Sequence, residues 1–176
     1  MLFRSFIIGL PSETDDDIKS IIKMTKEIKH VYFKEAKGEK WLNHITLSIS
    51  PFVPKPFTPF QWHPFEQVSI LKQKLKIISS GLRKEKKVRV NYDLPKWGYV
   101  QTLLSRGDRR AGRLLMQAFQ MQGDWAKAFR ETDINPDFYV YRERSFAEIL
   151  PWDFIDHGLD KRHLWKEYQS AITETE

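Results

Sequence analysis

The stretch Phe6 to Asp15 (FIIGLPSETD) constrains the fold of this chain more than any other. An apolar run ends at Gly9, a short loop follows, and three aspartates open an amphipathic segment. This order predicts a buried strand over residues 3–10, a tight loop, and a helix over about residues 14–29. Ligands of α/β proteins bind at the carboxyl ends of strands, so the loop after Gly9 is a candidate binding site.

The loop also has a purely structural explanation, and the residues alone leave both open. It could be an ordinary strand-to-helix turn in which Ser12 or Thr14 caps the helix and the aspartates complement its dipole. As a binding site, Gly9 would let a ligand approach the backbone, and the helix N-terminus would offer free amide hydrogens. No Gly-Lys-Ser/Thr follows, so the loop is not a phosphate-binding P-loop.

Two further strands are predicted, over residues 44–50 and 88–92, with a helix over 65–82 between them. In the first of these, apolar residues alternate with Thr46, Ser48 and Ser50, which would leave room for a ligand inside a barrel. Strands that alternate with helices predict an α/β fold, here the C-terminal portion of a partial (β/α) barrel over residues 1–93. A lone buried parallel strand needs neighbours, so we expect the chain to start inside a larger domain.

Residues 51–62 contain four prolines and predict a stiff extended loop with neither helix nor interior strand. Its aromatic side chains are candidates either for a core or for a pocket wall beside the Gly9 loop. The chain from residue 94 to 176 reads as a mainly helical appendage. Helices are predicted over 98–105, 110–121, 124–132 and 161–173, extended structure over the aromatic residues 137–142, and a loop over 150–158.

Charge suggests a second kind of function. The chain has 29 Lys and Arg against 23 Asp and Glu, and the excess clusters at residues 83–89 and 106–113. Residues 105–110 form either a solvated helix start capped by Asp108 or an anion site in which Arg106, Arg109 and Arg110 bind phosphate or carboxylate. Both clusters together would suit a self-standing basic module that binds RNA or another polyanion. A purely structural domain that packs its aromatic loop against a partner is a third alternative.

Composition excludes several kinds of site. There are no cysteines, so the chain can form no disulfide and can supply no thiolate to an iron–sulfur cluster. The histidines lack metal-ligand spacing, so no metal site is predicted. No apolar run approaches the roughly 20 residues of a membrane span, so we expect no membrane partner. A cytoplasmic location is the expectation.

Four stretches, taken together, resemble one family. Residues 6–18 are similar to the late barrel strand and loop of radical S-adenosylmethionine enzymes related to methylthiotransferases and to cobalamin-associated members. Residues 50–62 resemble the strand and loop that come next. Residues 105–110 and 150–159 are similar to the tail of a subfamily of iron–sulfur oxidoreductases, and the four stretches occur in that subfamily's order.

The resemblance implies an enzymatic reaction for which this chain could supply only part of the active site. Such enzymes bind a 4Fe-4S cluster through a CxxxCxxC loop, which is absent here, so the chain resembles their C-terminal part. The cluster and S-adenosylmethionine would belong to the longer parent, with neither expected to bind tightly to this part alone. The parent would cleave S-adenosylmethionine reductively and abstract hydrogen from a substrate, which in related methylthiotransferases is RNA or a ribosomal protein. The missing N-terminal part of the same polypeptide would be the partner of this chain.

The resemblance also implies site residues. The S-adenosylmethionine side of the barrel would be lined by residues of the two loops that follow the first two strands: Gly9, Pro11, Glu13, Thr14, Ser50, Phe52 and Val53. Their expected role is to position adenosine and exclude water, with the catalytic residues unknown. Arg106, Asp108 and Arg109 would bind substrate.

Overall fold

The computed structural model describes residues 2–35 and 44–173. The chain forms two compact units, one of Met1–Phe52 with Glu66–Gly98 and the other of Val53–Phe65 with Tyr99–Glu176. The expected division at residue 93 differs from these units, because Val53–Phe65 belongs with the C-terminal part of the chain. Each unit is described separately below.

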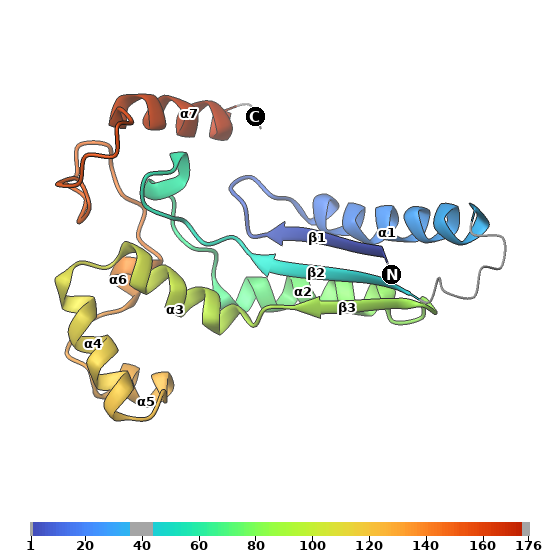
Figure 1. Ribbon diagram of the computed structural model, residues 1–176, viewed down its shortest axis with the longest axis horizontal. Helices are drawn as coiled ribbons and strands as arrows, with labels where there is room; N and C mark the ends of the chain where they lie inside the picture. The colour runs from blue at the N-terminus through green and yellow to red at the C-terminus, as the bar shows by residue number, and fades with distance from the viewer. Residues whose placement is uncertain (1, 36–43, 174–176) are drawn as a thin grey trace. The chain divides into compact units, whose positions relative to one another are not determined.

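The first unit is a three-stranded parallel sheet with a helix in each crossover (Figure 1). Strands β1 (Leu2–Ile8), β2 (Ile45–Pro51) and β3 (Val88–Tyr92) lie in the order β1-β2-β3. Helices α1 (Asp15–Glu35) and α2 (Val68–Leu82) connect them. The α/β class predicted from the sequence is confirmed, and the sheet is open.

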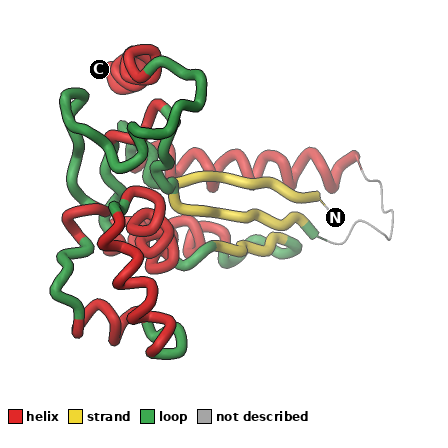
Figure 2. Tube along the Cα trace, turned by 60° about the vertical axis from the view of Figure 1, so that its left-hand side comes forward, coloured by secondary structure: helices red, strands yellow, loops and turns green. Residues whose placement is uncertain are grey.

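Both helices cover the same face of the sheet and pack against each other (Figure 2). Ile45, Leu47 and Ile49 of β2 are at most 1% exposed on the helix side. The helices contribute the apolar positions that the helical period predicted, namely Ile18 and Ile21 of α1 and Leu71, Leu75, Ile78 and Leu82 of α2. Gly81 permits their close approach, since a Cβ there would lie 2.6 Å from Ile22 Cδ1.

The opposite face of the sheet carries small polar residues on β2 and larger apolar residues on β1. The strand register sets Ser5 beside Ser48 and Asn91, and Ile7 beside Ser50, on the face that the helices do not cover. Phe3 and Ile7 of β1 are 51% and 53% exposed there. Parallel sheets are normally buried on both faces, so the exposure of this face departs from the usual arrangement. A proposed function has to account for it.

The second unit contains short helices around an aromatic core. Helix α3 (Pro95–Arg106) runs into it from the first unit, and the others are η1 (Pro59–Trp62), α4 (Arg109–Gln120), α5 (Trp125–Glu131), α6 (Asp137–Val140) and α7 (Lys161–Thr173). The core is Trp62, Leu150, Trp152, Leu164 and Tyr168, with Phe57, Phe60, Phe146 and Trp165 packed against it. The closing helix is confirmed at the predicted residues.

Two local predictions were wrong. Residues 137–142 were expected to be extended, but α6 occupies Asp137–Val140. The Asn135 side chain accepts a hydrogen bond from the Asp137 amide (3.1 Å), and this turn chemistry outweighs the strand preference of the aromatic residues. The proline-rich loop was expected to hold no helix, yet it ends in the 3₁₀ turn η1, whose fixed-φ Pro59 suits a first helical position. No helix in the described ranges is long and apolar enough to cross a membrane.

Candidate functional site

The carboxyl ends of the three strands meet at one edge of the sheet, and most of the predicted cofactor-binding residues lie there. Gly9 follows β1 with φ +80° and is buried. A Cβ at this position would lie 2.8 Å from Leu71 Cδ2 and 3.1 Å from Glu66 Cβ. Both the backbone conformation and the close packing of α2 therefore require glycine here.

Glu13 turns its carboxylate back onto the loop. Its two oxygens accept hydrogen bonds from the Gly9 amide at 3.0 and 3.1 Å. Lys74 of α2 approaches Glu13 Oε1 at 2.7 Å and Glu66 at 3.4 Å, and the Lys74 and Glu13 side chains are 8% and 7% exposed. Burial lowers the pKa of Lys74, but the hydrogen bond and charge of Glu13, with those of Glu66, outweigh it and hold this pKa above its ordinary value. Glu13 thus fixes the shape of the loop.

Thr14 caps helix α1 with a reciprocal pair of hydrogen bonds. Its amide and hydroxyl each donate to Asp17 Oδ2 at 2.8 Å, and the Asp17 amide donates to Thr14 Oγ1 at 3.3 Å. These bonds, first that from the Thr14 amide and then that from its hydroxyl, lower the pKa of Asp17. Of the two predicted caps, Thr14 is therefore the one the structure uses. Pro11 lies half-buried in the turn before it.

The other two strand ends are joined by Ser50 and Asp93. Ser50 Oγ donates to Asp93 Oδ2 at 2.7 Å, and the Asp93 amide donates to the Ile49 carbonyl at 3.0 Å. The Phe52 amide donates to the Ile8 carbonyl at 2.7 Å, which ties the second loop to the first. Sequence reasoning missed Asp93, although it follows the third strand as Gly9 follows the first. Val53, also predicted, belongs to the second unit.

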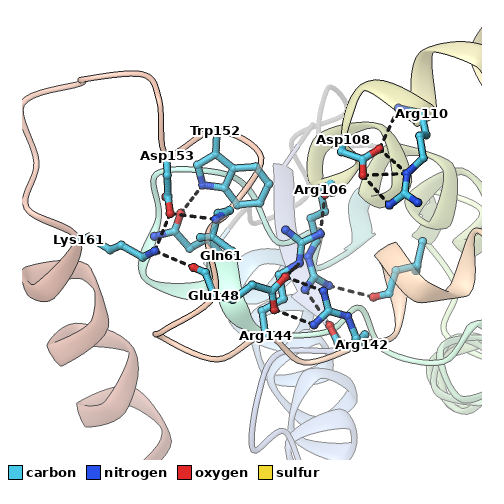
Figure 3. Close-up of polar contacts among 12 residues, drawn as sticks. Gln61, Arg106, Asp108, Arg110, Arg142, Arg144, Glu148, Trp152, Asp153 and Lys161 are labelled. Carbon is cyan, nitrogen blue, oxygen red and sulfur yellow. Dashed lines mark hydrogen bonds and ion pairs between the residues drawn. The ribbon is translucent and has the colours of Figure 1, made fainter.

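In the second unit, the buried side chain of Arg106 connects helix α3 to a later segment of the chain by hydrogen bonds to backbone carbonyls. Its side chain is 0% exposed and donates to the carbonyls of Val140 (3.0 Å) and Arg142 (2.9 Å). Arg144 Nη2 donates to the Arg106 carbonyl at 2.6 Å, and Arg142 makes two bonds of 2.7 and 2.6 Å to Glu148 (Figure 3). Burial, with the charges of Arg144 and Arg142, lowers the pKa of Arg106 to about 9.

Asp108 and Arg109 do not form a common site with Arg106. Asp108 caps α4 by accepting from the Arg110 amide at 2.8 Å, and it also pairs with the Arg110 guanidinium at 2.7 Å (Figure 3). Hydrogen bonds from Arg110, with smaller help from Tyr139, hold the pKa of Asp108 at about 2. Arg109 is exposed. The three residues predicted as one anion site therefore face different surroundings, and Arg110 is the arginine that pairs with Asp108.

Comparisons with known proteins are sparse. Over 110 residues the chain is 34% identical to the uncharacterized protein MJ0966 of Methanocaldococcus jannaschii. The match covers 62% of this chain but only 22% of that archaeal protein, so the chain spans about a fifth of the relative's length. No family model matches the chain, and no solved structure matches it. Within residues 2–35 and 44–173, no group of three or more His, Cys, Asp or Glu side chains could hold a metal ion.

Proposed function

We propose that this chain forms part of the barrel of a radical S-adenosylmethionine enzyme, and that it contributes to the cofactor and substrate pocket. The observation that carries the proposal is the parallel sheet with both helices on one face and small polar residues on the other. In a (β/α) barrel the helices lie outside, the other face lines the interior, and the active site lies at the carboxyl ends of the strands. The family resemblance of the loops after β1 and β2 places the expected pocket at that same edge.

The proposal implies two bound groups, a 4Fe-4S cluster and S-adenosylmethionine, and the residues of this chain suit only the second. A 4Fe-4S cluster does not fit, because the chain has no cysteine to supply thiolates. Another segment of a longer polypeptide would have to hold it, and we propose that segment as the partner of this chain in the cytoplasm. S-adenosylmethionine fits better, because Ser48 and Ser50 are small, bear hydroxyls and lie on the uncovered face.

This chain's own residues would shape and close the pocket. When bound, S-adenosylmethionine would be the group that is cleaved, and the reducing electron would come from the cluster that the other segment would hold. The Gly9–Glu13–Lys74 contact keeps the first loop rigid, so the strand end does not have to be ordered when a ligand binds. The bond from Ser50 to Asp93 orients a hydroxyl and a carboxylate at the pocket edge. Exposed Phe3 and Ile7 would be covered by neighbouring parts of the barrel and would exclude water.

The test begins with the reading frame upstream of the codon for Met1. We expect it to continue into a segment that encodes CxxxCxxC. The longer protein, purified without oxygen, should bind iron and form 5′-deoxyadenosine from S-adenosylmethionine, whereas the 176-residue chain alone should form none. Formation of 5′-deoxyadenosine by this chain alone, or a longer protein without iron, would contradict the proposal.

A variant on the uncovered face tests the site itself. Ser48→Phe should fill the barrel interior and lower 5′-deoxyadenosine formation by at least about tenfold, a loss typical of a blocked or misplaced substrate. Ser20→Phe, at an exposed position of α1, is the matched control and should leave the rate unchanged. Equal rates for both variants would mean that the uncovered face does not line the pocket.

A second candidate function, the binding of RNA or another polyanion, rests on a basic surface of the first unit. Lys26 and Lys29 of α1 lie 3.8 and 2.7 Å from Glu85, and Lys87 Nζ lies 4.6 Å from the Phe33 ring centroid. These contacts bring residues 23–35 and 83–89 together. The surface has eight basic residues (Lys23, Lys26, Lys29, Lys34, Arg83, Lys84, Lys86 and Lys87) and three acidic ones (Glu27, Glu35 and Glu85). The buried Arg106 does not contribute to it.

Salt dependence of RNA binding tests this surface. Binding of a fluorescent single-stranded RNA should weaken steeply with salt, with a log–log slope of about −0.7 per phosphate contacted. The double variant Lys84→Glu and Lys86→Glu should bind at least about tenfold more weakly and show a shallower slope. Arg109→Glu with Arg113→Glu makes the same charge change at the other basic cluster and should bind as the parent does. If the two double variants weaken RNA binding equally, the binding does not depend specifically on the basic surface of the first unit.

A further inference from the structure

A cavity of about 400 Å³ in the second unit lies beside the turn of residues 150–159, which the proposed function leaves unused. Its wall combines the proline-rich loop, this turn and the start of α7. Aromatic and apolar side chains make most of the lining, and the polar lining residues are Gln61, Asp153, Asp156, His157 and Lys161. A cavity of this size with a few fixed polar groups is typical of a small-ligand site.

Gln61 presents a fixed hydrogen-bond donor. Its side chain is 2% exposed, and its Oε1 accepts from Trp152 Nε1 at 2.7 Å and from the Phe57 amide at 3.2 Å (Figure 3). Both partners are donors, so the oxygen of the amide is identified and the NH₂ group must be on the other side. Nε2 has no hydrogen bond to any residue that the structure describes. The NH₂ group is therefore available to donate a hydrogen bond to a ligand in the cavity.

Two carboxylates supply acceptors. Asp153 Oδ2 accepts hydrogen bonds from the Leu150 amide (2.9 Å) and from Lys161 Nζ (2.6 Å). Asp156 Oδ1 accepts one from the Gly158 amide at 2.9 Å. The second oxygen of each carboxylate makes no hydrogen bond within the described part of the chain. Lys161 is already held between Asp153 and the Glu148 carbonyl. Apart from the His157 ring, the polar lining thus offers one amide donor and two carboxylates, and the two negative charges disfavour a phosphate or another anion.

The aromatic lining suits a flat ring. Phe57 and His157 form one part of it, with ring centroids 4.1 Å apart and a 54° tilt. Phe154, at 85% exposed, and Ile155 lie at the mouth of the cavity, where they would cover a bound ring. Aromatic side chains that stack on bases are the usual means by which proteins hold an unpaired nucleobase.

We propose that this cavity binds a guanine base. Guanine presents a carbonyl oxygen next to two N–H donors on one edge, and this edge complements an amide NH₂ and a carboxylate on the wall of the same cavity. Gln61 Nε2 would donate to the carbonyl, and Asp156 would accept from the ring N–H and the amino group. Adenine has an acceptor where guanine has the ring N–H, so it would face the carboxylate unfavourably. The proposal does not depend on the barrel.

The test is calorimetric titration of the full 176-residue chain with GMP and with AMP. In parallel, single-stranded hexaribonucleotides with one guanine or one adenine are titrated, to distinguish a free nucleotide from a base within RNA. We expect guanine ligands of at least one kind to bind at least about tenfold more tightly than their adenine counterparts. Absence of binding by every guanine ligand, or equal affinity for guanine and adenine, would overturn the proposal.

Two variants locate the binding. Asp156→Asn, at an exposed side chain, keeps the acceptor for the Gly158 amide and should weaken guanine binding about tenfold or more. Asp133→Asn makes the same charge change away from the cavity and should bind as the parent does. Gln61→Glu keeps the oxygen that Trp152 uses but replaces the donor, and it should abolish binding in protein shown to be folded by circular dichroism. If Asp156→Asn and Asp133→Asn bind guanine equally, the site lies elsewhere and the proposal fails.

Discussion

Replacement of Lys74 by methionine is expected to lower the free energy of unfolding of the first unit by about 3–5 kcal/mol. Lys74 lies 2.7 Å from Glu13, and both side chains are more than nine-tenths buried. The variant would leave the Glu13 carboxylate buried without its cation, and an unpaired buried charge is among the most costly defects a fold can contain. Denaturant unfolding followed by circular dichroism would measure the loss.

Two further variants separate charge from packing in this experiment. Lys72→Met lies on the exposed side of the same helix and should change stability little. Glu13→Gln combined with Lys74→Met should recover much of the loss, since a neutral amide oxygen still accepts from Gly9 and no charge is left unpaired. If Lys74→Met and Lys72→Met have the same free energy of unfolding, the Lys74–Glu13 pair does not stabilise the loop. The proposal of a rigid pocket edge would then be wrong.

Replacement of Arg106 by methionine is expected to destabilise the second unit by about 2–6 kcal/mol, since two buried carbonyls would each lose a charged donor at about 1–3 kcal/mol apiece. The carbonyls of Val140 and Arg142 would be the ones left unpaired. Near-ultraviolet circular dichroism during thermal unfolding would detect the change, because the core of this unit is rich in tryptophan. Arg109→Met, at an exposed position, is the control and should unfold as the parent does.

This experiment also decides between the two interpretations of the cluster that begins at Arg106. An anion site would predict that Arg106→Met and Arg109→Met weaken binding of a phosphate-bearing ligand while leaving stability intact. The burial of Arg106 predicts the reverse, a large loss of stability for the first variant and none for the second. A stable Arg106→Met protein with weakened anion binding would restore the interpretation drawn from the sequence.

Local sequence patterns predicted the elements well where one physical rule dominates. Strand β3 was placed at the observed residues, and the polar and apolar alternation of β2 predicted which face the helices cover. Thr14 was one of two predicted caps, and the structure uses it. These features depend on residues a few positions apart, whose spacing is visible in the sequence. Short turns were harder, as α6 shows, because one side chain such as Asn135 can reverse the preference of several aromatic neighbours.

The sequence by itself determined the α/β class, the polar face of β2 and the loop–helix start after Gly9, because periodicity and capping are local. Only the tertiary structure decided what the charged residues do. Glu13 was assigned to a ligand but contacts Lys74, which is 61 positions away in the chain. Arg106 was assigned to an anion but is buried against backbone carbonyls. The partner of a charged side chain is set by how distant segments pack, and the free energy of burying a charge makes that partner decisive.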